Sequence, residues 1–120
     1  MGETVQRPGR TCPIGYRYAP QVFQRPPELV AQTLYVVGGL YGNRAALDTV
    51  ETLALRDRAQ LVFNGDFHWF DIRPDLFSEI NRRVLAHAAL RGNVETELAS
   101  DDGAAGCGCA YPEDVGDDEV

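Results

Sequence analysis

Two short apolar runs, each ending in a polar turn that contains glycine, constrain the fold of this chain more than any other feature. The first run covers residues 34–37 and stops at a pair of glycines; the second covers residues 61–63 and stops at residues 64–66. Short β-branched runs bounded by such turns are typical of buried strands. Between them, Asn43 is a good N-cap for a series of apolar residues at helical spacing. The order strand, helix, strand predicts a parallel sheet with a right-handed crossover.

A second helix and a weaker strand follow. Pro74 suits the first turn of a helix, and the residues after it give that helix one apolar face. These apolar residues are Leu76, Phe77, Ile80, Val84 and Leu85. Residues 88–90 read as a weak third strand, and residues 94–99 as one or two further helical turns. We therefore predict an α/β domain with parallel βαβ strands and with helices packed on the sheet.

Composition divides the chain into three segments. Residues 1–31 are rich in proline and are predicted to form an extended arm or leader, because proline disfavours helices and central strands. Residues 32–100 carry the α/β pattern, and 120 residues leave room for one small domain. Residues 101–120 form an acidic, glycine-rich tail that we expect to be poorly ordered.

The charge of the chain disfavours several classes of partner. Residues 1–100 carry eleven acidic and eleven basic side chains, so the net charge of -7 comes from the tail. Without a basic stripe, nucleic acid is not expected as a partner. No apolar run approaches the roughly 20 residues that cross a bilayer, and no signal peptide is visible, so we expect no membrane partner and a cytoplasmic location. Three cysteines, an odd number, fit that compartment.

Each expected strand is followed by a polar turn, at residues 38–43, 65–66 and 92–95. In an open α/β sheet, ligands bind beyond the carboxyl ends of the strands. These turns are therefore predicted to converge on one functional site.

The residues of these turns, and their order, resemble the motif series of the calcineurin-like metallophosphoesterase superfamily. That series runs Asp-x-His, Gly-Asp-x-x-Asp and Gly-Asn-His-Glu/Asp, followed by two histidine motifs, and the resemblance covers residues 33–98. It places Asp66 at the carboxylate that bridges two metals, and Asn93 at the asparagine that binds one metal and the substrate phosphate. It implies hydrolysis of phosphate mono- or diesters, a small phosphorylated substrate, and a divalent metal cofactor (manganese, iron, zinc or magnesium).

The sequence departs from this pattern at several positions. Gly39 stands where the first metal-binding aspartate is expected, and Tyr41 stands where the histidine is expected. Trp69 and Val94 replace further motif residues, and the two later histidine motifs do not occur. Two ligands cannot hold two divalent ions, so we predict that this polypeptide alone is inactive, a pseudoenzyme. The partner expected for an incomplete domain of this kind is either a missing C-terminal half or, in a homo-oligomer, further copies of this chain.

Other residues offer weaker metal-site hypotheses. His68 and Asp71 lie in an aromatic loop beside the expected site and are conceivable substitute ligands, although stacking of His68 within the loop is the simpler interpretation. Cys107 and Cys109, with Cys12 far away, lack the spacing of a structural zinc site, so reduced thiols in a glycine-rich loop are expected.

Two other classes of function stay open. Half of a two-sheet domain would expose an apolar face, which favours a non-catalytic α/β module for binding or oligomerisation. Residues 37–42, between the first strand and helix, suggest a dinucleotide-binding unit. They satisfy only the last two glycines of Gly-x-Gly-x-x-Gly, at Gly39 and Gly42. The acidic residue that ends the second strand, Asp66, comes somewhat later than the usual distance.

Overall fold

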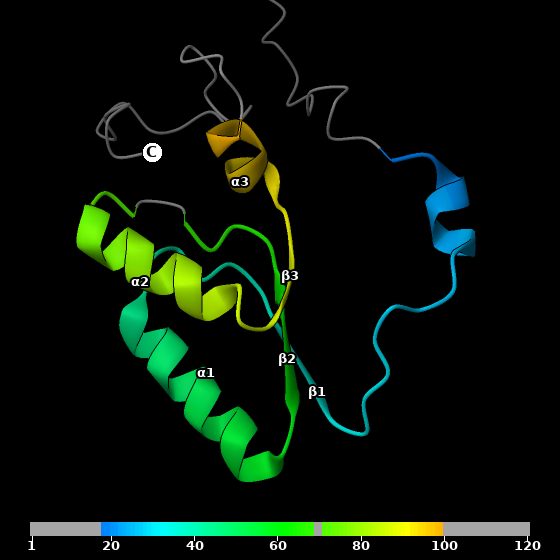
Figure 1. The fold of residues 1–120 in the computed structure, drawn as a ribbon, viewed down its shortest axis with the longest axis horizontal. Helices are drawn as coiled ribbons and strands as arrows, with labels where there is room; N and C mark the ends of the chain where they lie inside the picture. Colours follow the sequence, from blue (N-terminus) through cyan, green and yellow to red (C-terminus); the bar gives the residue numbers. More distant parts are fainter. Residues whose placement is uncertain (1–17, 69–70, 100–120) are drawn as a thin grey trace, which may run out of the picture.

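A computed structural model describes residues 18–68 and 71–99 of the protein (Figure 1). The elements are η2 (Pro20–Gln24), β1 (Leu34–Val37), α1 (Arg44–Asp57), β2 (Gln60–Asn64), α2 (Pro74–Val84), β3 (Ala88–Leu90) and α3 (Asn93–Leu98). The chain is α/β, as predicted. The short 3-10 helix η2 lies in the arm that was expected to avoid helix, and it begins at Pro20, whose fixed φ suits a first helical position. The acidic tail lies outside the described residues.

The three strands form one parallel sheet in the order β1-β2-β3, which confirms the parallel arrangement predicted from the sequence. The register pairs Leu34 of β1 with Gln60 of β2, and Val62 of β2 with Ala88 of β3. Because the strands run in the same direction, their carboxyl ends meet at one edge of the sheet.

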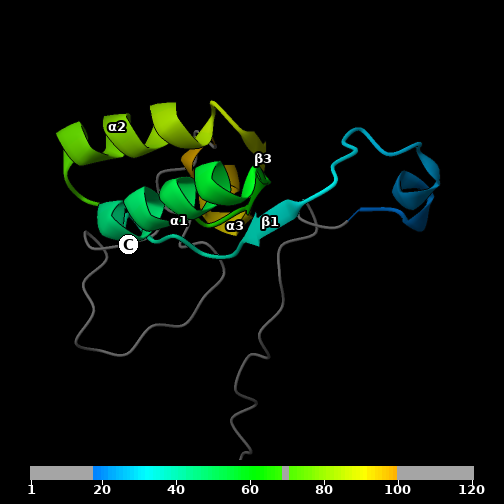
Figure 2. The same ribbon diagram turned by 90° about the horizontal axis from the view of Figure 1, so that it is seen from below.

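Both long helices cover the same face of the sheet (Figures 1 and 2). Helix α1 has Asn43 as its N-cap, as predicted, and the side-chain oxygen of Asn43 accepts a hydrogen bond from the Ala46 N–H at 3.0 Å. It ends at Asp57, and the C-cap residue Arg58 adopts a left-handed conformation with φ of 53°. Helix α2 has Pro74 in its first turn, also as predicted.

The hydrophobic core lies between these helices and the sheet. Its buried members are Leu40, Leu47, Ala54, Leu61, Phe63, Phe67, Ile80 and Val84. Full burial of one such large side chain stabilises the fold by about 1.5–3 kcal/mol. The expectation that Leu85 belongs to the apolar face of α2 is wrong: this residue caps the helix and is 60% exposed, because α2 ends at Val84.

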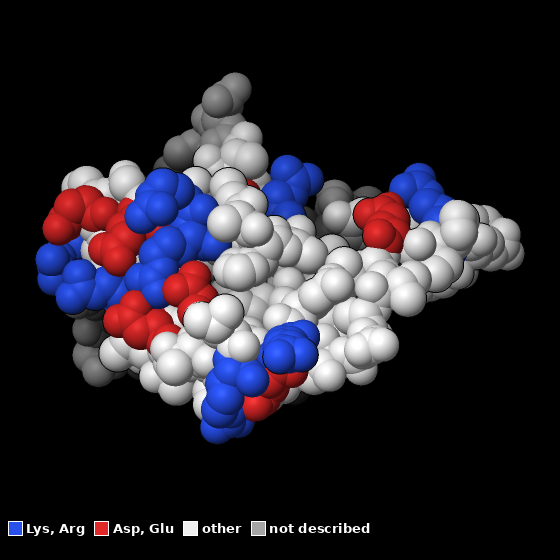
Figure 3. Space-filling view, turned by 60° about the horizontal axis from the view of Figure 1, so that its bottom comes forward, with Lys and Arg blue, Asp and Glu red and all other residues white. Residues whose placement is uncertain are grey.

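Helices α1 and α2 are also joined by an ion-pair cluster on Arg83. Its guanidinium lies 2.7 Å from Asp48 and 2.5 Å from Glu51 of α1, and 3.1 Å from Glu79 of α2. Figure 3 shows charged side chains of both signs gathered on one side of the surface, whereas much of the rest of that view is uncharged. Arg83 therefore holds the two helices together at their outer surface.

The second face of the sheet is uncovered within the described part of the chain. Leu34, Val36 and Leu90 point to this face, and Val36 is 60% exposed. The arm that carries η2 runs on this side but stands apart from the strands (Figure 1). Parallel sheets are normally covered on both faces. No helix of residues 18–68 and 71–99 is long and apolar enough to cross a membrane.

Candidate functional site

The turns after β1 and β2 are joined by two backbone hydrogen bonds. The Tyr41 N–H donates to the carbonyl oxygen of Asp66 at 3.3 Å, and the Gly42 N–H donates to that of Phe67 at 2.9 Å. The turn after the first strand is therefore fixed against the turn that carries Asp66.

The turns after β2 and β3 pack against each other through two glycines. A Cβ atom on Gly65 would lie 2.6 Å from the Gly92 nitrogen, and Gly65 has a φ of 80°, which glycine adopts at low cost. A Cβ atom on Gly92 would collide with the Asp66 carboxylate. Only glycine permits this close approach, so all three turns converge, as the sequence predicted.

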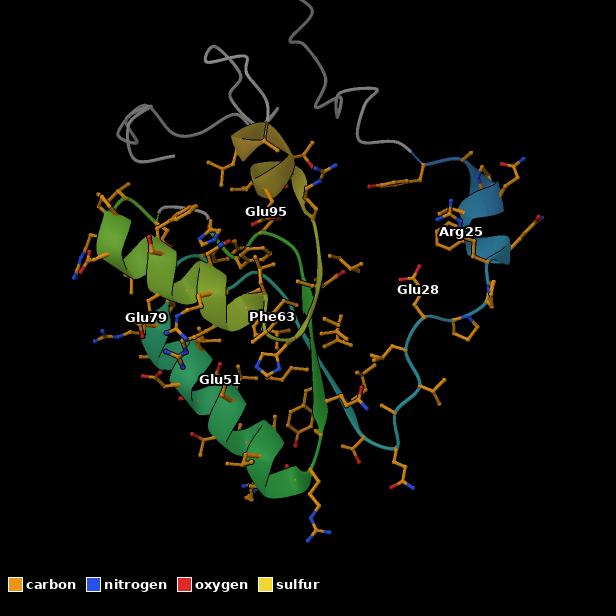
Figure 4. All side chains as sticks on the ribbon, viewed as in Figure 1. Arg25, Glu28, Glu51, Phe63, Glu79 and Glu95 are labelled. Atoms are coloured by element: carbon orange, nitrogen blue, oxygen red, sulfur yellow. The ribbon has the colours of Figure 1, made fainter. Side chains whose placement is uncertain are left out.

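Glu95 links the same two turns through its carboxylate (Figure 4). It accepts hydrogen bonds from the backbone N–H groups of Asp66 and Gly92, and from those of two residues that follow Asp66. The sequence places Glu95 in the third turn, at the acidic position of Gly-Asn-His-Glu/Asp, but it was not predicted as a site residue. One signal was available: Glu95 lies three residues after Gly92 at the start of α3, the spacing at which a glutamate reaches back to the N-cap N–H.

Asp66 occupies the centre of this arrangement. Its φ is 56°, an uncommon conformation for a residue with a side chain, and its Oδ1 accepts a hydrogen bond from the Val94 N–H at 3.4 Å. Burial raises the pKa of the Asp66 carboxyl, the Val94 hydrogen bond opposes this, and the nearby charge of Glu95 raises the pKa further. Asn93, which begins α3, comes directly after Gly92. Both carried-over residues therefore lie at the meeting point of the turns.

Gly39 and Tyr41, the two positions at which the sequence resemblance implies lost ligands, contact each other. The ring of Tyr41 lies over Gly39, so that a Cβ atom at Gly39 would be 2.6 Å from the Tyr41 hydroxyl oxygen. The space into which an aspartate at position 39 would extend is therefore filled by an aromatic ring.

His68 and Asp71 form a buried polar cluster with Asn81 of α2. The Nδ1 atom of His68 lies 3.1 Å from Asp71 Oδ2, and Nε2 lies 3.1 Å from Asn81 Oδ1. The ring stacks on Phe77 with centroids 3.8 Å apart and meets Phe67 edge-on at 4.9 Å. Both ring nitrogens of His68 are engaged by protein oxygens, which leaves neither placed to bind a metal. The edge-on contact with Phe67 lies within the loop, as expected, whereas the stacked contact is with Phe77 of α2.

The residues that meet at the turns do not fit a two-metal centre. Such a centre needs several oxygen or nitrogen ligands for each ion, whereas Asp66 and Asn93 are two. Among the described residues, no group of three or more His, Cys, Asp or Glu side chains could hold a metal ion. Trp69 and the cysteines at positions 12, 107 and 109 lie outside the described residues.

Comparison of the chain with protein-family models, with curated proteins and with solved structures finds no match. The resemblance to metallophosphoesterases therefore rests on the turn residues alone.

Proposed function

We propose that this chain is a relative of the calcineurin-like metallophosphoesterases that keeps their strand-end scaffold but does not hydrolyse phosphate esters by itself. The observation that carries the proposal is the meeting of three glycine-containing turns around Asp66, directly beside Gly92 and Asn93. The raised pKa of Asp66 supports it, because perturbed carboxyl groups cluster at functional sites.

The absence of activity is expected from the ligands that the turns supply. In metal-dependent phosphoesterases two ions lower the pKa of a bridging water, orient the phosphate and stabilise the displaced oxygen. Asp66 and Asn93 together offer too few ligands for that clamp, and the Tyr41 ring fills the space beside Gly39. Asp66 and Asn93 therefore support no catalytic step by themselves, and the ligand that the resemblance implies is a small phosphorylated molecule.

Activity assays test the first part of this proposal. Purified protein with added manganese is expected to hydrolyse p-nitrophenyl phosphate and its bis ester no faster than an Asp66→Ala variant. Turnover at rates ordinary for enzymes, abolished in that variant, would contradict the proposed loss of activity.

Restoring the first motif tests the relationship to the family. Gly39→Asp alone is expected to destabilise the protein, because the new side chain meets the Tyr41 ring. The double variant Gly39→Asp, Tyr41→His removes that collision and adds two ligands beside Asp66. Elemental analysis is expected to show more bound divalent metal in the double variant than in wild type. Equal metal content in the two proteins would count against descent from a metal site.

A second candidate function is self-association through the uncovered sheet face. Specific interfaces need about 800 Å² from each partner, which three short strands alone do not offer. The arm adds exposed apolar side chains at Tyr18, Phe23 and Val30, and Phe23 is 85% exposed. The occupant we infer for the face is therefore the arm of a second copy of this chain.

We do not propose a dinucleotide site. The Gly-rich fingerprint works because the backbone approaches a pyrophosphate closely at its second glycine. At Gly39 the Tyr41 ring lies over the backbone instead.

A further inference from the structure

The carboxylate of Glu95 fills a ring of four backbone amides at the end of the sheet. Its Oε2 accepts from the N–H groups of Asp66 at 2.8 Å and Gly92 at 2.9 Å. Its Oε1 accepts from those of Phe67 at 2.8 Å and His68 at 3.4 Å. Each oxygen thus receives two donors, which is the hydrogen-bonding pattern that a planar, two-oxygen anion satisfies.

The backbone conformation after β2 produces this ring. Gly65 and Asp66 both have positive φ, 80° and 56°, and the three N–H groups that follow Gly65 point to one side. Successive N–H groups turned to one side form a concave anion-binding nest. Gly92 adds a fourth donor from the turn after β3, which it does because Gly65 and Gly92 lie in contact.

We propose that the turns after β2 and β3 form a carboxylate-binding nest, that Glu95 is its resident ligand, and that Glu95 is the positioning residue of the site. The negative charge offsets the four inward dipoles and keeps Asp66 beside Gly92 and Asn93. The role of Glu95 in positioning ligands rests on the proposed function, whereas the carboxylate preference of the nest does not.

The nest has consequences for what binds at this end of the sheet. Because Glu95 occupies the four amides, the nest is closed to a phosphate group while this side chain is in place. When the side chain is shortened, the nest is vacated and takes a small free carboxylate, formate or acetate, in preference to tetrahedral phosphate or to chloride.

The test uses Glu95→Ala in the full chain, with Glu28→Ala as a control that removes an exposed glutamate from the arm. Glu95→Ala is expected to melt at a lower temperature than wild type, and formate is expected to raise its midpoint progressively. Chloride at equal ionic strength restores nothing, and formate does not shift the Glu28→Ala protein. The amide resonances of Asp66, Phe67 and Gly92 move in Glu95→Ala and return toward their wild-type positions with formate.

If formate and chloride act alike, or if those three resonances stay unmoved, the nest is overturned. If Glu95→Ala does not fold, amide hydrogen exchange in the wild-type protein provides a second test. The amide hydrogens of Asp66, Phe67 and Gly92 are expected to exchange on the order of 100-fold more slowly than that of exposed Arg73. Exchange at equal rates also overturns the proposal.

The positioning role is tested in the background Gly39→Asp, Tyr41→His. Adding Glu95→Ala is expected to reduce its metal content, and formate is expected to restore it. If metal binds equally with and without Glu95, the positioning role fails. If the double variant binds no metal while formate still rescues stability, the proposed function fails and the nest stands.

Discussion

Asp66 combines two unfavourable features at one residue: a left-handed backbone and a carboxylate partly withdrawn from water. Each costs free energy, the backbone on the order of 1–2 kcal/mol for a residue with a side chain. Two hydrogen bonds offset part of this cost: the Val94 N–H donates to the Asp66 carboxylate, and the Asp66 N–H donates to the Glu95 carboxylate. A residue that combines backbone strain with a raised pKa is expected to serve a functional site and to lower the stability of the fold.

Asp66→Asn is therefore expected to stabilise the protein at neutral pH, on the order of 0.5 kcal/mol. The pKa of Asp66 is raised in the folded state, so the folded protein holds this proton at higher pH than the unfolded chain does. The contribution of Asp66 to stability consequently falls as pH rises from the ordinary aspartate pKa through the raised one. Urea unfolding at several pH values measures how the free energy of unfolding changes with pH. The Asp66→Asn variant is expected to lack the decrease that Asp66 causes.

Asp75→Asn is the control with the opposite sign. The N–H of Leu76 donates to the Asp75 carboxylate and lowers its pKa, so stability from Asp75 is present above the unfolded pKa and is lost as pH falls through the folded one. A loss of stability at neutral pH in Asp66→Asn as well as in Asp75→Asn would contradict our view of Asp66.

Between elements, Arg83 of α2 forms ion pairs with two carboxylates of α1. Three carboxylates surround its guanidinium, and the side chain is only 16% exposed. An ion pair shielded in this way contributes more than one at an open surface.

Arg83→Ala is expected to cost about 1–2 kcal/mol of unfolding free energy, because Asp48, Glu51 and Glu79 then repel one another. The loss is expected to shrink in high salt, which screens that repulsion. Arg82→Ala, at the exposed neighbouring position of the same helix, is the matched control and is expected to change stability little. Equal effects of the two substitutions would show that the cluster does not connect the helices.

In the molecule as a whole, the sheet has one face covered by helices and one that residues 18–68 and 71–99 leave uncovered, and the uncovered face predicts self-association. Val36→Glu is expected to shift the protein toward monomer, because burying a carboxylate in an apolar interface is unfavourable. Leu55→Glu, at a position of α1 that is 83% exposed, is the control. Sedimentation or size-exclusion measurements over a concentration series report the result. A wild-type protein that is monomeric throughout and melts cooperatively would exclude this role for the face.

Local patterns in the sequence predicted most elements because their signals are local. The apolar runs indicated β1 and β2, Asn43 indicated the start of α1, and Pro74 indicated the start of α2. The convergence of the turns was predictable from the parallel order. The end of α2 was misjudged at Leu85, because an apolar side chain there matches the helical spacing although the helix has already ended.

The parts of the site that could not be predicted from the sequence depend on residues far apart in the chain. The Glu95 carboxylate meets amides 27 to 29 residues away, and the capping spacing around residue 95 indicates only its bond to Gly92. Similarly, the partner of His68 on α2, Asn81, is brought near by packing and not by spacing. The contact of the Tyr41 ring with Gly39 is local, but it could not be predicted because it depends on the left-handed backbone of Tyr41.

The strand order has a consequence for how the chain folds. Partners in register are 26 residues apart in both ladders, Leu34 with Gln60 and Val62 with Ala88. Closing either crossover therefore has nearly the same loop-entropy cost, and each strand pairs with the strand next to it in the sequence. During synthesis the first unit, β1-α1-β2, is complete before β3 leaves the ribosome. Folding can thus proceed by addition of one crossover at a time, in the direction of translation.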